Sequence, residues 1–267
     1  MGFALWVRLL TPLFAKVKVD PGWLDRVRAE SERGLAVHVI EATGLLDFAL
    51  LSYLLRKHNL PQPTHTNTRS VAWLKPLLLL LFYPLIWLFN LIFRRRDQIA
   101  AFTESVAAGR TGLVFLKRGR FVMLPGGNIG VDYLKALVGL QRKQDKPVIL
   151  LPQVIFWTPS PEKYHKGIVE LLIGGPTAPG PRKLLSLVLN PSRGLVTCGE
   201  PVSIDRIIEK NEGSDDEEIA RTVTWTLHRA IDGEEKIVRG PLMKTAVQVK
   251  NEMMSNPDFI GRVEELG

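Results

Sequence analysis

Apolar and polar positions along the chain follow two alternating patterns, one typical of buried strands and one typical of helices. Short continuous apolar runs are separated by segments in which apolar residues recur every three or four positions. These patterns predict strands at Ala36–Glu41, Leu113–Lys117 and Val148–Trp157, and a last strand in GLVTCGEPVSI that Gly199 and Pro201 end. They predict helices at Leu45–His58, Asp97–Ala108, Val131–Lys143 and Ser203–Lys210. Alternation of this kind indicates an α/β domain, a sheet flanked by helices.

Several single residues add local detail. Ser214 and Glu217 have the spacing of a capping box and predict a helix that runs to about Ile231. Pro152 has no N–H for a sheet ladder and predicts a bulge or an edge in its strand. His38 and Cys198 stand in mid-strand, where we expect a hydrogen-bonded core histidine and a buried thiol.

The longest apolar run is Pro76–Phe93, in which 13 of 18 residues are Leu, Ile or Phe. As a helix it would be about 27 Å long, close to the roughly 30 Å hydrocarbon core of a bilayer. Three arginines follow it directly, and arginines favour the cytoplasmic side of a membrane segment. We expect membrane contact through Trp73, Leu80, Trp87, Phe93, Arg94, Arg95 and Arg96.

The place of this run in the chain indicates how it meets the membrane. A predicted strand precedes it and further strands follow it, so both of its flanks lie on one side of the bilayer if the strands share a sheet. Lys75 and Arg94 bracket the run with positive charge, and Pro84 offers a break near its middle. We therefore predict a re-entrant hairpin or an interfacial helix pair at the cytoplasmic face of the inner membrane.

Charge is divided unevenly along the 267 residues, whose net charge is +8. Residues 1–146 hold 21 Lys and Arg against 10 Asp and Glu, and residues 147–267 hold 14 against 17. The positive half also carries the apolar run, and its aromatic residues do not alternate with its basic ones, which argues against nucleic acid as a partner. A single cysteine excludes an internal disulfide, and no spacing of ligands suggests a metal or a cofactor.

The stretch LAVHVIEATGLLDFALLSYLL, with GLVFLKR after it, resembles the opening blocks of the glycerol-phosphate acyltransferase superfamily. PVILLPQVIFWTPSPEKY, LVTCGEPVSI and GPLMK resemble one subfamily more specifically, the large bacterial membrane-bound glycerol-3-phosphate acyltransferase. The likeness covers roughly residues 30–245 and matches the region before that enzyme's catalytic domain. It implies membrane lipids as partners, and acyl-CoA or acyl carrier protein as partners of the full-length enzyme.

The catalytic motifs of the superfamily are degenerate here. Its HxxxxD motif pairs a histidine base with an aspartate five positions later, but Ala42 stands at the histidine position before Asp47. A block with the core Glu-Gly-x-Arg is reduced to PGGN, of which Gly126 and Gly127 occupy the centre. The resemblance thus implies a domain without the catalytic base.

Lys117, Arg118 and Arg120 form a basic group after the second strand-like block. The resemblance links this block to the phosphate of the acceptor, and charge-assisted hydrogen bonds would also hold a lipid head group. A basic strand end that faces solvent is the simpler alternative.

These observations predict three segments. Residues 1–30 hold an amphipathic or docking helix, residues 31–245 an acyltransferase-like α/β domain with the membrane insertion 76–93, and residues 246–267 a linker or helix toward a missing catalytic domain. The leading hypothesis is the N-terminal region of a glycerol-3-phosphate 1-O-acyltransferase. One alternative is a complete non-catalytic pseudo-acyltransferase that binds lipid or a partner enzyme. Another is a self-sufficient enzyme with an unusual base, for which His165 with Glu170 is the nearest spacing.

Overall fold

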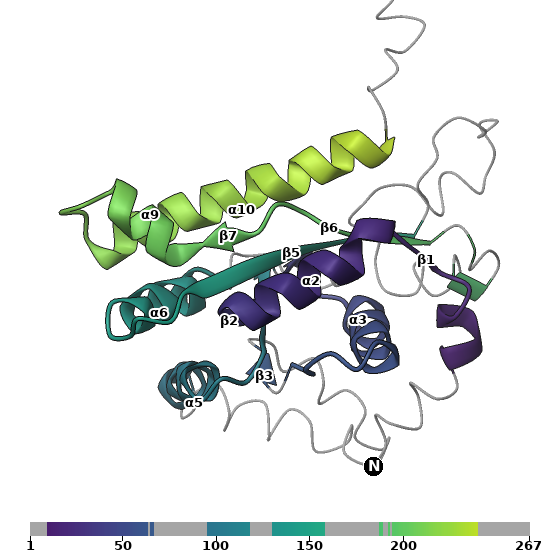
Figure 1. The fold of residues 1–267 in the computed structure, drawn as a ribbon, viewed down its shortest axis with the longest axis horizontal. Helices are drawn as coiled ribbons and strands as arrows, with labels where there is room; N and C mark the ends of the chain where they lie inside the picture. Colours follow the sequence, from purple (N-terminus) through teal and green to yellow (C-terminus); the bar gives the residue numbers. More distant parts are fainter. Residues whose placement is uncertain are drawn as a thin grey trace, which may run out of the picture.

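The computed structural model describes residues 10–63, 65–66, 95–117, 130–157, 187–188, 192 and 194–239, with backbone alone at 45, 65–66, 95–97 and 239. This part of the chain forms a seven-stranded mixed sheet with helices on both faces (Figure 1). The strands lie across the sheet in the order β1 (Lys18–Val19), β6 (Leu195–Cys198), β5 (Val148–Phe156), β2 (Leu35–Ala42), β4 (Gly112–Lys117) and β3 (His65–Thr66), with β7 (Val202–Ser203) also paired to β5. The predicted α/β class, a sheet flanked by helices, is confirmed.

The centre of the sheet is parallel and buried on both faces. β2 runs parallel to β4 and to β5, and β3 runs parallel to β4, whereas β6 and β7 are antiparallel to β5. Val37 and Val39 of β2 pack against one helical layer, while Ala36 and Ile40 pack against the other. Burial on both sides explains why the central strands read as continuous apolar runs.

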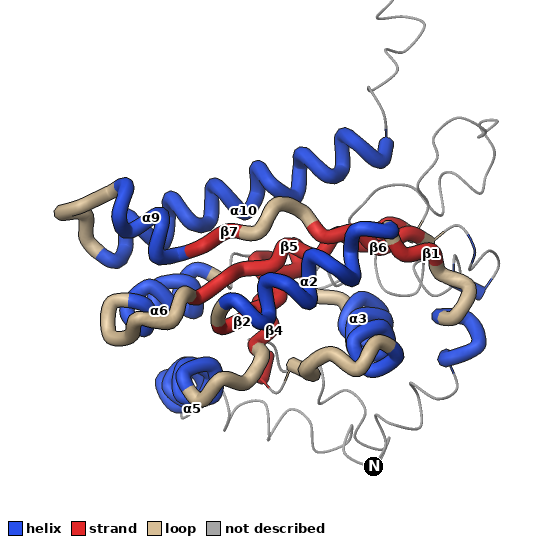
Figure 2. The backbone as a smooth tube through the Cα atoms, in the orientation of Figure 1, coloured by secondary structure: helices blue, strands red, loops and turns tan. Residues whose placement is uncertain are grey.

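Two helical layers cover the sheet, as Figure 2 shows. One layer consists of α2 (Pro21–Arg33) and α3 (Leu45–Lys57), whose core side chains include Trp23 and Leu50. The other consists of α5 (Arg95–Ala107), α6 (Val131–Gln141), α9 (Ile204–Lys210) and α10 (Asp216–Arg239), with Phe102 and Leu137 in its core. The connections place the start of α3 and the start of α6 near the carboxyl ends of the parallel strands.

The last predicted strand is confirmed as β6, and a further two-residue strand, β7, follows it. β6 ends at Cys198 and β7 begins at Val202, with Pro201 between them. The same gap explains Pro152, which lies inside β5 beside β2 and opposite the break between β6 and β7. Residues 199–201 there face only residues 151–152, so one strand has an extra residue, as in the predicted bulge. Pro152 pairs with Val39 of β2, and its carbonyl accepts from the Gly199 amide at 2.8 Å, where the β6 ladder stops. Its missing N–H therefore falls at a break between two short partner strands.

The start of α10 also differs from the predicted capping box. The carboxylate of Asp215 accepts from the Glu218 amide at 2.7 Å, which places the cap one residue after Ser214. The helix extends to Arg239, eight residues beyond the predicted end. Its amphipathic pattern continues past Ile231, so the helix has no local reason to stop there.

The proposed membrane insertion is not tested by this structure. The run 76–93 and the segments 1–9 and 240–267 lie outside the described residues. Among the helices that the structure does describe, none combines the length and apolar character needed to cross a bilayer.

Candidate functional site

Three parallel strands end at one edge of the sheet, and the degenerate motif lies there. β2 ends at Ala42, β4 at Lys117 and β5 at Phe156. Ala42 pairs directly with Lys117, and the Thr43 amide continues the ladder to the Lys117 carbonyl at 3.0 Å. In open α/β sheets, ligands bind at the carboxyl ends of the strands. This edge is therefore the candidate site.

The HxxxxD positions span the turn from β2 into α3. Ala42 is half-buried at the end of the strand, and Asp47 is the third residue of the helix, with 2% of its surface exposed. The sequence prediction that Asp47 is a charge at a helix N-terminus is confirmed. A methyl group at position 42 can neither accept nor donate a proton, so the position that carries the base in the superfamily supplies none here.

The Asp47 carboxylate is buried and hydrogen-bonded within the core. Its Oδ1 accepts from the Trp157 indole Nε1 at 2.8 Å, and both side chains are buried. Its Oδ2 lies 1.9 Å from where a Cβ on Gly44 would stand, so only glycine fits at the start of α3. The tie joins the N-terminus of α3 to the end of β5. We call it the Asp47–Trp157 tie.

Sequence reasoning missed this role of Trp157, which it placed only at the end of a predicted strand. The two partners are 110 residues apart, and no local pattern links them. The adjacency of β2 and β5 in the sheet brings them together. Among sequence features, only the position of Trp157 directly after a long predicted strand could have drawn attention to it.

Lys117, one of the proposed phosphate ligands, forms an ion pair at this edge. Its Nζ lies 2.8 Å from Oε1 of Glu41, the residue before Ala42, and both side chains are partly exposed. His228 of α10 faces the same pair: its pKa is lowered by burial first and then by the charge of Lys117, while Glu41 acts in the opposite direction. The cation of Lys117 is thus partly balanced by a carboxylate. Arg118, Arg120, Gly126 and Gly127 lie outside the described residues.

His38 does not replace the missing base. It lies in the middle of β2, with 1% of its surface exposed, and pairs across the sheet with Leu113 and Leu151. Burial lowers its pKa to about 4, so it is neutral at pH 7. The expected burial is confirmed, but the expected hydrogen bonding is not complete, because Nδ1 has no partner. A ring enclosed in this way cannot reach an acceptor hydroxyl.

Cys198 is equally enclosed. Burial raises the pKa of its thiol to about 12, and its Sγ accepts from Gln153 Nε2 at 3.4 Å. The Gln153 side chain in turn accepts from Trp23 Nε1 at 2.7 Å, while Arg26 binds the Cys198 carbonyl. This buried network connects α2, β5 and β6 and explains a mid-strand glutamine structurally. The described side chains include no cluster of three or more His, Cys, Asp or Glu able to hold a metal.

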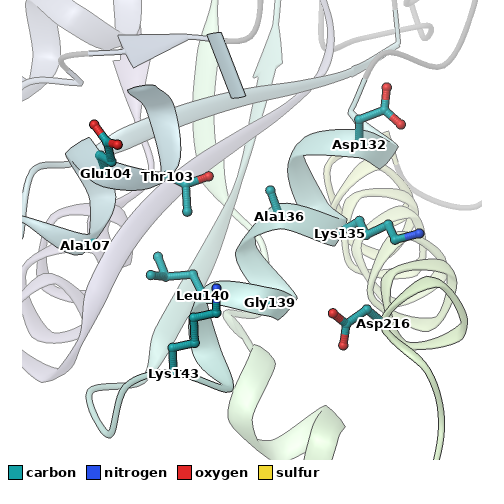
Figure 3. A pocket seen from close by; sticks show the side chains of 10 residues that line it. All are labelled: Thr103, Glu104, Ala107, Asp132, Lys135, Ala136, Gly139, Leu140, Lys143 and Asp216. Carbon is teal, nitrogen blue, oxygen red and sulfur yellow. The ribbon is translucent and has the colours of Figure 1, made fainter. Parts of the chain in front are cut away.

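A groove of about 460 Å³ lies away from this edge, between α5 and α6 and beside the start of α10 (Figure 3). Thr103, Ala136 and Leu140 point into it, whereas Asp132 points away from it. Its lining contains neither Ala42 nor Asp47 nor Lys117. The groove is therefore not part of the degenerate motif.

The comparisons with known proteins agree with the resemblance found in the sequence. Residues 107–238, from the end of α5 to the end of α10, match the family model described as the glycerol-3-phosphate acyltransferase PlsB N-terminal domain. No curated protein matches the chain. The matched residues include β4, α6, β5, β6 and α10, whereas the central strand β2 and the helices α2 and α3 lie outside the match. Residues 107–238, just under half of the 267-residue chain, are thus similar to the N-terminal domain of PlsB glycerol-3-phosphate acyltransferase.

Proposed function

We propose that this chain is the N-terminal region of a glycerol-3-phosphate 1-O-acyltransferase and acts there as a non-catalytic scaffold and membrane-docking domain. The reaction of that enzyme transfers an acyl group from acyl-CoA or acyl carrier protein to glycerol 3-phosphate. The observation that carries the proposal is the carboxyl edge of the sheet. Ala42 replaces the base there, and the Asp47 carboxylate is bound to Trp157. An acyltransferase-like sheet without a base at this edge favours a structural role for the domain over a catalytic one.

The fold supports docking at one membrane face. The segment that contains Pro76–Phe93 starts after β3 and ends at α5. β3 pairs with β4, and α5 packs against β2, β3 and β4, so both ends of the segment belong to one folded unit. This arrangement favours a re-entrant or interfacial segment over a single crossing, with the folded unit at the cytoplasmic face.

Lys117, Arg118 and Arg120 remain our proposed contacts for a phosphate or a lipid head group. Because Glu41 already balances part of the charge of Lys117, we expect this lysine alone to contribute modestly to binding a phosphate or a head group. Changing all three residues to Ala should weaken binding to anionic vesicles at low salt, where screening is weakest. Unchanged binding under that condition would remove them from the docking surface.

The central test is an assay of acyl transfer with the purified chain. We expect no glycerol-3-phosphate-dependent release of CoA from acyl-CoA and no transfer from acyl carrier protein. Added to vesicles with a family catalytic domain that carries HxxxxD, the chain should increase that domain's membrane retention and turnover. A His165→Ala variant serves as the control for an unusual base.

The outcomes separate the hypotheses. Turnover by the chain alone that His165→Ala abolishes would establish a self-sufficient enzyme. Failure to affect the catalytic domain, with vesicle binding intact, would favour the pseudo-acyltransferase that binds lipid.

A further inference from the structure

Three cations gather where α2 meets the C-terminus of α3. Arg56 and Lys57 occupy the last turn of α3, and Arg28 lies on the exposed side of α2. The two helices touch near this point, where the rings of Trp23 and His58 lie 6.2 Å apart. We call Arg28, Arg56 and Lys57 the basic corner.

The basic corner has no carboxylate partner among the described residues. None of its three side chains forms an ion pair or a side-chain hydrogen bond with another described residue. By contrast, Arg26 and Arg33 on the same helix α2 pair with Glu234 and Glu30. The pKa of His58 is lowered by its partial burial and then by the charges of Lys57 and Arg28, which places both cations near one imidazole. The corner is thus a region of uncompensated positive charge.

The corner belongs to the edge of the fold from which the apolar run departs. The chain passes from the end of α3 to β3, the terminal strand of the sheet, and returns at α5, which contacts β3. In Figure 1, α3, β3 and α5 lie along the lower side of the fold and α10 along its upper side. Helix α3, which ends with Arg56 and Lys57, therefore shares one side with β3 and α5, the described elements that flank the apolar run in the sequence.

The opposite side carries a run of four acidic residues, two of which are ion-paired: Asp216 with Arg142, and Glu217 with Lys135 and Arg221. The turn between α9 and α10 and the first turn of α10 contain Asp215, Asp216, Glu217 and Glu218 in succession. In Figure 1 this turn lies at the upper left, away from α3 and β3. An anionic surface would attract the first side and repel the second, which orients the domain as well as binding it.

We propose that the α3–β3 edge, with Arg28, Arg56 and Lys57, faces the anionic surface of the lipid bilayer, and that the α9–α10 turn faces away from it. This inference rests on the proposed membrane docking and adds the orientation. The partner is a membrane and not a polyanion in solution, because β3 and α5, which lie on the same side as α3, flank an apolar run of bilayer-spanning length in the sequence.

The test uses the full chain and phosphatidylcholine vesicles with or without phosphatidylglycerol. The double variant Arg56→Gln/Lys57→Gln should lose about 5- to 25-fold in affinity for the anionic vesicles, about fivefold for each cation near the surface. The matched control, Arg221→Gln/Arg229→Gln on α10, removes the same charge from the opposite side and should bind as wild type. On vesicles, amide exchange should slow over residues 56–63 and remain unchanged over residues 211–218.

Different results overturn different claims. Equal losses in both double variants, or amide protection over 211–218 alone, would reject the orientation and leave membrane docking in place. Absence of wild-type binding to either vesicle would reject membrane docking and the orientation with it. The exchange measurement needs no variant, so a misfolded mutant could not obscure the answer.

Discussion

The Asp47–Trp157 tie can be measured by a double-mutant cycle. Trp157→Phe keeps the ring and removes the indole N–H, while Asp47→Leu removes the acceptor at similar volume. A hydrogen bond to a charged group contributes about 1.5–3 kcal/mol, and a buried group left without its partner costs about 1–3 kcal/mol. Each single variant should therefore lower the free energy of unfolding by about 2–4 kcal/mol. The coupling between them should be about 1.5–3 kcal/mol.

Asp47→Asn provides the matched control in this cycle. An amide oxygen still accepts from the indole, so only the interaction of the charge with the N-terminus of α3 is lost, about 0.3–1 kcal/mol. Urea unfolding followed by far-ultraviolet circular dichroism would give the free energies, with the m-value checking that the transition remains comparable.

Two results would refute the reasoning about this pair. Additive single effects, within about 0.5 kcal/mol, would mean that the hydrogen bond contributes nothing to stability. An Asp47→Asn variant that kept its stability but lost an acyl-transfer activity of the chain would return Asp47 to catalysis.

Three further predictions follow from buried groups. The pKa of His38 is lowered from 6.5 to about 4, so the free energy of unfolding should fall by about 3 kcal/mol as the pH drops from 6.5 toward 4. His38→Leu should reduce this loss in urea unfolding measured at several pH values, and an unchanged pH dependence would contradict the role of His38. The Cys198 thiol, with its pKa raised to about 12, should resist alkylation at pH 8 until urea unfolds the chain, and rapid native labelling would contradict its burial. Gly34→Ala would place a Cβ 2.3 Å from the Pro147 carbonyl and should cost about 1–3 kcal/mol by urea unfolding, whereas wild-type stability would mean that this contact relaxes freely.

At the candidate site, the end of β2 and the start of α3 hold Ala42 and Asp47, the two positions that resemble the HxxxxD motif. Asp47 accepts a hydrogen bond from Trp157. The sheet and the Asp47–Trp157 tie are stabilised by burial and hydrogen bonding, which need no reacting group, so such a fold can exist without catalysis.

Features encoded within a short window could be predicted from the sequence alone. The apolar runs predicted β2, β4 and β5 to within a residue or so, and helical spacing predicted α3 and α6. The same local reading located Asp47 at a helix N-terminus and Ala42 at a strand end. These properties depend on side-chain periodicity and on neighbours a few positions away, which the sequence displays directly.

Features that join distant segments were decided only by the tertiary structure. The Asp47–Trp157 tie, the Lys117–Glu41 pair and the interior position of Pro152 each depend on which strand lies beside which. A local pattern predicts that a strand exists but carries no information on its neighbour or its register, because both are chosen by the packing of the whole sheet. The sequence by itself thus determined the elements and the missing base, and the assembled sheet decided what the remaining aspartate does.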